Sequence, residues 1–171
     1  MKPTPAQLRS DLRYARIAKR CGMQNSLRTA WEARAAGVSP SLAFAMVEQE
    51  SGDGANVFGH DDSIYRGAGK ITKAKYFAYK RQRGPFGHGG MQGVGPLQLT
   101  WYSIQDAADS LGGCHLPKHN LRQGFRTLAE LIRVYGHADG IRRYNGSGPA
   151  ADAYSHSVQK REQKWHKRFH G

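Results

Sequence analysis

Hydrophobic residues recur every three to four positions along most of the chain, a spacing that predicts α-helices. The expected helices cover residues 5–20, 25–36, 39–50 and 72–82, a segment after Asn120 that ends at Gly136, and a last helix with Tyr154, Val158, Trp165 and Phe169 as its inner stripe. Ser39 and Pro40 suit the start of the third helix, and Gly52 suits its end. The fold class is therefore expected to be mainly α.

The helix expected over residues 39–50 carries an acid on its apolar side. At about 100° per residue, its apolar stripe consists of Leu42, Ala43, Met46 and Val47. Glu50 projects near the middle of this stripe, whereas Glu48 points to the opposite side. Partial burial and the negative end of the helix dipole both raise the pKa of such a carboxyl, so Glu50 can stay protonated near neutral pH and act as a general acid. A helix cap or an ion pair with an arginine is the alternative explanation.

The length and charge limit the classes of protein to consider. A chain of 171 residues fits a single domain, in which we expect the helices of residues 5–36 to pack on a core of residues 37–170. The formal net charge of +13 predicts a polyanion or an anionic surface as a neighbour. Nucleic acid, a membrane and an acidic cell wall all meet that description.

Several features are expected to be absent. No apolar run is long enough to span a bilayer, and the first residues lead into a charged helix, so we expect a chain made in the cytoplasm without a signal peptide. Cys21 and Cys114 match no metal or redox spacing and are expected to be buried free thiols, with a disulfide as the alternative. The histidines are scattered, so neither a metal site nor a cofactor is expected.

Residues 52–95 form the longest irregular stretch, and such stretches commonly bind ligands. A small β-hairpin is expected within residues 52–65. Phe58, Asp61 and Asp62 lie there, shortly after Glu50; ordinary turn formation is the alternative role for the aspartates. A basic cluster follows at Lys70, Lys73, Lys75, Lys80, Arg81 and Arg83, and predicts either a solvated face or an anion site.

A glycine-rich segment over residues 93–101 is the second candidate binding segment. Gly93 and Gly95 allow the backbone to approach a ligand closely, and Gln98 can donate and accept hydrogen bonds with an amide or a sugar hydroxyl. A tight turn with an exposed glutamine is the alternative. Trp101 is expected in the core or in the wall of a groove.

Three motifs in order resemble those of the lysozyme-like transglycosylases, the group of soluble lytic transglycosylases and goose-type lysozymes. They are Glu50-Ser51-Gly52, the GVGPLQLT segment of residues 93–100, and Tyr144-Asn145-Gly146. The Asn56–Asp61 segment and the form GPLQLTW are most similar to endolysins of phages that infect actinobacteria. The resemblance spans residues 36–165 and implies a lysozyme-like helical domain with a substrate cleft between the Glu50 helix and the Gln98 loop.

The resemblance also implies roles for individual residues. Glu50 matches the catalytic acid. Residues expected to contact the glycan are Phe58, Gln98, Thr100, Tyr144 and Asn145. The chain departs from the family pattern at Leu97, where a methionine is common, and at Gly146, where an alanine is common.

The implied reaction is cleavage of peptidoglycan between N-acetylmuramic acid and N-acetylglucosamine, with Glu50 protonating the leaving oxygen. A carboxylate across the scissile bond, for which Asp61 is preferred and Asp62 is the alternative, would activate water and give an inverting hydrolase. Without that carboxylate, Glu50 would take the proton back from the sugar's 6-hydroxyl and leave a 1,6-anhydro product, as in lytic transglycosylases.

Two other functions fit parts of the sequence. A chitinase or endolysin of the glycoside hydrolase 19 type is second, because the GPLQLTW form is similar there. A basic nucleic-acid-binding helical domain ranks third among the candidate functions, since the sequence contains no helix-turn-helix or zinc signature. We therefore expect a monomer that acts on the bacterial cell wall, with peptidoglycan strands and the anionic wall surface as partners and no nucleic acid.

Overall fold

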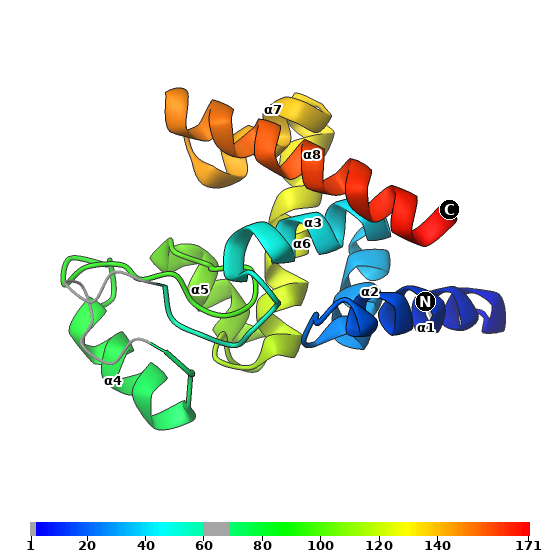
Figure 1. Cartoon of the computed structure of the whole chain (residues 1–171). Coiled ribbons are helices and arrows are strands. Elements are labelled where there is room, and N and C mark those ends of the chain that lie inside the picture. Colours follow the sequence, from blue (N-terminus) through cyan, green and yellow to red (C-terminus); the bar gives the residue numbers. More distant parts are fainter. Residues whose placement is uncertain (1–2, 60–68) are drawn as a thin grey trace.

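The computed structural model describes residues 3–59 and 69–171, and over these residues the chain is mainly α-helical, as the sequence predicted. Its helices are α1 (Pro5–Arg20), α2 (Ser26–Ala36), α3 (Pro40–Ser51), α4 (Lys73–Arg83), α5 (Tyr102–Ser110), α6 (Pro117–Tyr135), α7 (His137–Asn145) and α8 (Pro149–His170) (Figure 1). Of the region in which a hairpin was expected, residues 52–59 are described, and they make isolated β-bridges from Val57 to Lys70 and from Phe58 to Val94. Residues 60–65 of that region lie outside the described residues.

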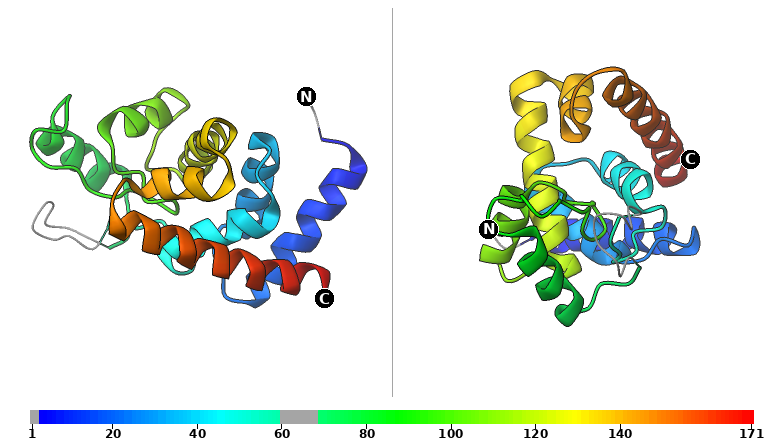
Figure 2. Two further views of the ribbon diagram at one scale, coloured as in Figure 1. Left: turned by 90° about the horizontal axis from the view of Figure 1, so that it is seen from above. Right: turned by 90° about the vertical axis from the view of Figure 1, so that its left-hand side faces the viewer.

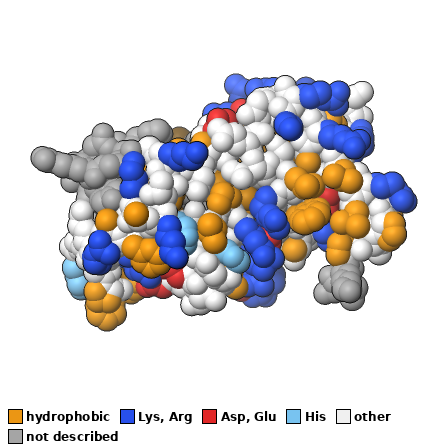
Figure 3. Space-filling model, turned by 90° about the horizontal axis from the view of Figure 1, so that it is seen from below, with side chains coloured by type: hydrophobic (Ala, Val, Ile, Leu, Met, Phe, Trp, Pro, Cys, Tyr) orange, Lys and Arg blue, Asp and Glu red, His pale blue; other side chains and the backbone are white. Residues whose placement is uncertain are grey.

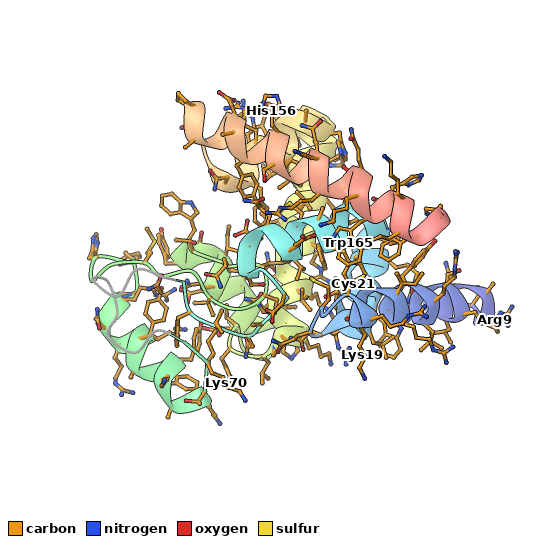
Figure 4. The ribbon with its side chains drawn as sticks, viewed as in Figure 1. Arg9, Lys19, Cys21, Lys70, His156 and Trp165 are labelled. Atoms are coloured by element: carbon orange, nitrogen blue, oxygen red, sulfur yellow. The ribbon has the colours of Figure 1, made fainter. Side chains whose placement is uncertain are left out.

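Helix α3 lies at the centre of the molecule. Its first turn is capped by Ser39, whose hydroxyl accepts a hydrogen bond from the amide of Leu42 at 3.2 Å, as the sequence predicted. All residues from 41 to 47 are buried, because α8 packs along α3 (Figure 2). Phe44 of α3 contacts the rings of Trp165 and Phe169 in α8, with centroid distances of 5.3 and 5.5 Å. Figure 4 labels Trp165 on α8. This packing fixes the end of α3 that carries Glu50.

Helix α6 is the second packing centre and contacts α2, α5 and α7. It buries Leu121, Phe125 and Leu128. At one end of the molecule α1 and α2 form a helical hairpin, and α1 meets the C-terminal end of α8 (Figure 2). There the Arg13 guanidinium donates to the carbonyl of Phe169 at 2.6 Å, so the two ends of the chain are joined.

Helix α4 is held to α5 by polar side chains. The buried Arg83 pairs with Asp106 at 2.8 Å, and Lys80 pairs with Asp109 at 2.6 Å. Two members of the predicted basic cluster are therefore structural cations, not part of a solvated face or an anion site. Helix α5 itself was not predicted.

The two cysteines are free, but only Cys114 is buried. Burial raises the pKa of its thiol to about 12. Cys21 is exposed, so the expectation that both thiols are buried was wrong for Cys21. In residues 3–59 and 69–171, no helix is both long and apolar enough to cross a membrane.

On one face of the molecule (Figure 3), the positive charge is divided among separate groups. On the face shown in Figure 3, Lys and Arg side chains form several separate groups with hydrophobic side chains between them. Some cations are neutralised by acids, such as Arg122 by Glu32 at 2.8 Å. The described surface therefore has no single basic stripe on this face.

Candidate active site

A cleft of about 230 Å³ lies beside the C-terminal end of α3. It is lined by Glu50, Met91, Gln98, Leu99, Thr100, Trp101, Ile104, Thr127, Tyr144 and Asn145. The lining thus combines the end of α3, the loop before α5, one residue each of α5 and α6, and the end of α7. Residues from three motifs far apart in the sequence meet here, and the lining includes five residues that were expected to act on or contact the substrate: Glu50, Gln98, Thr100, Tyr144 and Asn145.

Glu50 is half-buried in the last turn of α3, where Gly52, with a φ of 76°, ends the helix. Burial raises the pKa of its carboxyl from 4.5 to about 7, and a hydrogen bond from the Tyr154 hydroxyl of α8 opposes part of that rise. Glu50 therefore stays protonated to a much higher pH than an ordinary glutamate. This matches the expectation from the apolar stripe, although the partner Tyr154 was not foreseen.

Glu48, two residues earlier, has a different environment. Its carboxylate accepts hydrogen bonds from Arg161 at 2.9 Å and from the Trp165 indole at 2.6 Å. Glu50 has no ion pair with any cation in the described part of the chain. An ion pair with an arginine was the alternative role for Glu50. The structure shows this ion pair at Glu48, which does not line the cleft.

Two uncharged tyrosines, Tyr154 and Tyr144, are close enough to Glu50 to feel its charge. Burial, together with the negative charge of Glu50, raises the pKa of both Tyr154 and Tyr144 well above the usual value of 10. Both phenols therefore stay protonated and remain hydrogen-bond donors. Tyr154 donates to Glu50, and Tyr144 donates to the carbonyl of Leu97 at 3.1 Å.

The loop that faces Glu50 is tied to three helices. Asn120 of α6 donates to the carbonyl of Val94 at 2.7 Å and accepts from the amide of Leu97 at 3.1 Å. Tyr144 of α7 adds its bond to Leu97, and the Ser51 hydroxyl of α3 lies 2.9 Å from the carbonyl of Pro96. The cleft wall is therefore a preorganised loop, held at a fixed position relative to the acid.

Gln98 lines the cleft, but its amide group is used within the protein. It adopts a φ of 43°, and its amide nitrogen lies 3.0 Å from the carbonyl of Val57 and 2.8 Å from that of Gly95. A Cβ at Gly93 would lie 2.4 Å from the Gln98 side-chain oxygen, and one at Gly95 would lie 2.5 Å from Asn120. The absence of a side chain at Gly93 and Gly95 therefore makes room for Gln98 and Asn120. The sequence had suggested that these glycines let the backbone approach a ligand.

Phe58 does not reach the cleft. Only 1% of its surface is exposed, and its ring packs against Tyr79 at a centroid distance of 5.6 Å. The expectation that Phe58 contacts a substrate is thus corrected, because the residue belongs to the hydrophobic core. Asp61 and Asp62 lie outside the described residues.

No protein-family model, curated protein or solved structure matches this chain. The chemistry of the cleft is therefore argued from its own residues. Within residues 3–59 and 69–171, no group of three His, Cys, Asp or Glu side chains is placed to hold a metal ion, and Glu50 is the acid of the cleft lining. The arrangement can deliver a proton from Glu50 to a bound ligand.

Two residues that shape this site, Tyr154 and Asn120, were given no such role by the sequence. Tyr154 counted only as part of an apolar stripe, although a buried phenol needs a hydrogen-bond acceptor. In the sequence, Asn120 only marked the start of a helix. In the structure its side-chain amide is buried and makes hydrogen bonds to the backbone of Val94 and Leu97. Trp101, expected in the core or a groove wall, lies in the cleft wall with 59% of its surface exposed.

Proposed function

We propose that this protein cleaves the glycan strands of peptidoglycan between N-acetylmuramic acid and N-acetylglucosamine, as an endolysin that degrades the bacterial cell wall. One observation carries the proposal: a half-buried glutamic acid with a pKa of about 7 lines a cleft together with the residues of the three motifs. A general acid with a pKa near the working pH is the group that protonation of a glycosidic oxygen requires.

In the first step, Glu50 transfers its proton to the oxygen that leaves with the departing sugar, and the glycosidic bond breaks. The Tyr154 hydroxyl donates a hydrogen bond to the Oε1 atom of the Glu50 carboxyl. The Oε2 atom has no hydrogen bond to a residue in the described part of the chain, so it is the oxygen that would carry the transferred proton. After transfer, the Tyr154 bond stabilises the carboxylate that remains.

The second step decides the reaction class. If Asp61 or Asp62 faces the sugar across a water molecule, that water attacks and the enzyme is an inverting muramidase. If Glu50 is the only acid at the cleft, its carboxylate takes the proton of the sugar's 6-hydroxyl, which attacks its own ring carbon and gives the 1,6-anhydro product of a lytic transglycosylase.

The charge of the chain suits this substrate. Peptidoglycan carries carboxylates, and long-range attraction to a chain of net charge +13 raises the rate of encounter. A neutral chitin-like polymer would gain less from this charge. On the face shown in Figure 3, the cations form separate groups, an arrangement that suits a diffuse anionic surface.

The direct test is lysis of purified cell walls, followed as loss of turbidity, by the wild type and by Glu50→Gln. We expect the variant to lose at least about 100-fold in rate, because general acid catalysis contributes that much or more. Glu130→Gln makes the same chemical change at an exposed residue of α6 outside the cleft and should leave lysis unchanged. A folded Glu50→Gln variant with normal lysis would refute the role of Glu50.

A further inference from the structure

The Trp101 side chain has an exposure that packing does not explain. It shows 59% of its surface, and it makes no ring contact, cation–π contact or hydrogen bond to the side chains of the described chain. The other two tryptophans are covered: Trp165 is buried in the core, and the Arg28 guanidinium lies 5.3 Å from the ring centre of Trp31. Exposure alone does not identify a ligand site, because Phe86 is 62% exposed. Trp101 differs in that its indole lines the Glu50 cleft, where a bound ligand would remove its apolar surface from water.

The indole stands on a rigid support. Its backbone carbonyl accepts hydrogen bonds from the amides of Ile104 and Gln105, which begin α5. The buried Gln105 side chain lies 2.8 Å from the carbonyl of Leu99 and 3.1 Å from that of Thr100. Gln105 is itself fixed, because its oxygen accepts from the buried Arg83 at 2.8 Å. The segment that presents Trp101 is therefore held in place before any ligand binds.

Trp101 lines the same cleft as Glu50. A pyranose ring has an apolar face of C–H groups and a rim of hydroxyls, so it can lie flat on an indole while its hydroxyls reach polar neighbours. Thr100 and Asn145, both exposed in the same lining, offer such polar groups. We propose that Trp101 is a sugar-binding platform, on which one N-acetylhexosamine ring of the glycan stacks while the neighbouring bond lies at Glu50.

This inference rests on the proposed function and deepens it, because it names the residue that holds the glycan by its apolar face. It also predicts a polymeric substrate, since one sugar on Trp101 and another beyond the scissile bond must be engaged together. The platform contributes binding and takes no part in proton transfer.

The test measures binding separately from cleavage. The Glu50→Gln chain, which should bind without cutting, is titrated with a soluble oligosaccharide of alternating N-acetylglucosamine and N-acetylmuramic acid. Its affinity is measured by isothermal titration calorimetry, and its tryptophan emission is followed in parallel. Adding Trp101→Ala should weaken binding roughly tenfold or more, as expected for loss of a large apolar contact. Adding Trp101→Phe should keep most of the affinity but abolish the emission change, because Trp31 and Trp165 lie outside the cleft lining.

A matched control removes another exposed aromatic ring. Phe77→Ala in α4, at a residue with 43% exposure outside the cleft lining, should leave the affinity unchanged. If the Glu50→Gln chain binds the oligosaccharide equally well with and without Trp101, the platform is refuted while the proposed function stands. If that chain binds no oligosaccharide, the platform is refuted too, and wall lysis by the wild type then shows separately whether the proposed function survives.

Discussion

The Tyr154 hydroxyl of α8 donates a hydrogen bond to the Glu50 carboxyl of α3. The two residues are 104 positions apart in the sequence, and the packing of α8 along α3 brings them together. Two opposed influences act on the acid: burial raises the pKa of Glu50, and the hydrogen bond from the Tyr154 phenol lowers it. The balance places the pKa at about 7, where a carboxyl can both give and regain a proton.

Removing the phenol should shift the pH profile of activity. In Tyr154→Phe the carboxylate loses a donor, so the pKa of Glu50 rises, and the decline of activity at high pH should move upward by roughly 1 pH unit. Rates of wall lysis measured from pH 5 to 9 test this. Tyr135→Phe, at an exposed residue outside the cleft lining, is the matched control. An unmoved profile in Tyr154→Phe would mean that the phenol only packs.

Glu50 should make the folded state less stable as the pH rises. Its pKa is about 7 when folded against 4.5 for an ordinary glutamate, so between these values the folded chain binds more protons than the unfolded chain. Stability contributed by this residue is therefore greatest below pH 4.5 and falls as the pH rises to 7. The total loss is at most about 3 kcal/mol, because Glu50 is only half-buried.

Glu50→Gln, which is neutral at every pH, should consequently melt at a higher temperature than the wild type at pH 8. The difference should disappear near pH 4. Thermal unfolding at the two pH values, followed by circular dichroism, measures it. Equal melting temperatures at pH 8 would show that the carboxylate is well solvated, and the argument for a raised pKa would fail.

Gln98 should matter for stability as well as for activity. In Gln98→Glu the amide donors facing the carbonyls of Val57 and Gly95 are lost, and a carboxylate replaces them. We expect a loss of about 2 kcal/mol in the free energy of unfolding, measured with denaturant. Gln163→Glu, at an exposed position of α8, should cost little. Lost activity with unchanged stability would assign Gln98 to substrate contact alone.

The second carboxylate can be tested without knowing its position. If the hydrolytic route operates, Asp61→Asn should slow lysis about 100-fold or more, while Asp62→Asn should retain most of the rate. The reverse result would make Asp62 the base. Normal turnover in both variants would leave Glu50 as the only catalytic carboxylate and assign the aspartates to the turn.

The sequence predicted those parts of the fold that depend on local signals. The ends of α3 follow from Ser39, Pro40 and Gly52, and Glu50 was recognised because the residues before it form an apolar stripe. Helix α5 was missed because it is short, and its N-cap residue, Trp101, makes no capping hydrogen bond with its side chain. A short helix without a cap has little local signal.

The contacts that build the site depend on tertiary packing, which the sequence does not reveal. Tyr154, Asn120 and Gln105 each bond to groups that neighbouring helices and loops bring to them. Each is a polar residue on the buried side of a helix, and such positions require a hydrogen-bond partner. This signal marks them as important, but it does not name their partners.

The most direct test of the central claim is mass spectrometry of the fragments released from purified peptidoglycan by the wild type and by Glu50→Gln. The account predicts fragments cut between N-acetylmuramic acid and N-acetylglucosamine by the wild type and none by the variant. Reducing muramic ends would assign hydrolysis, and products lighter by one water would assign transglycosylation. Release of the same glycan fragments by a folded Glu50→Gln variant, or of none by the wild type, would contradict the account.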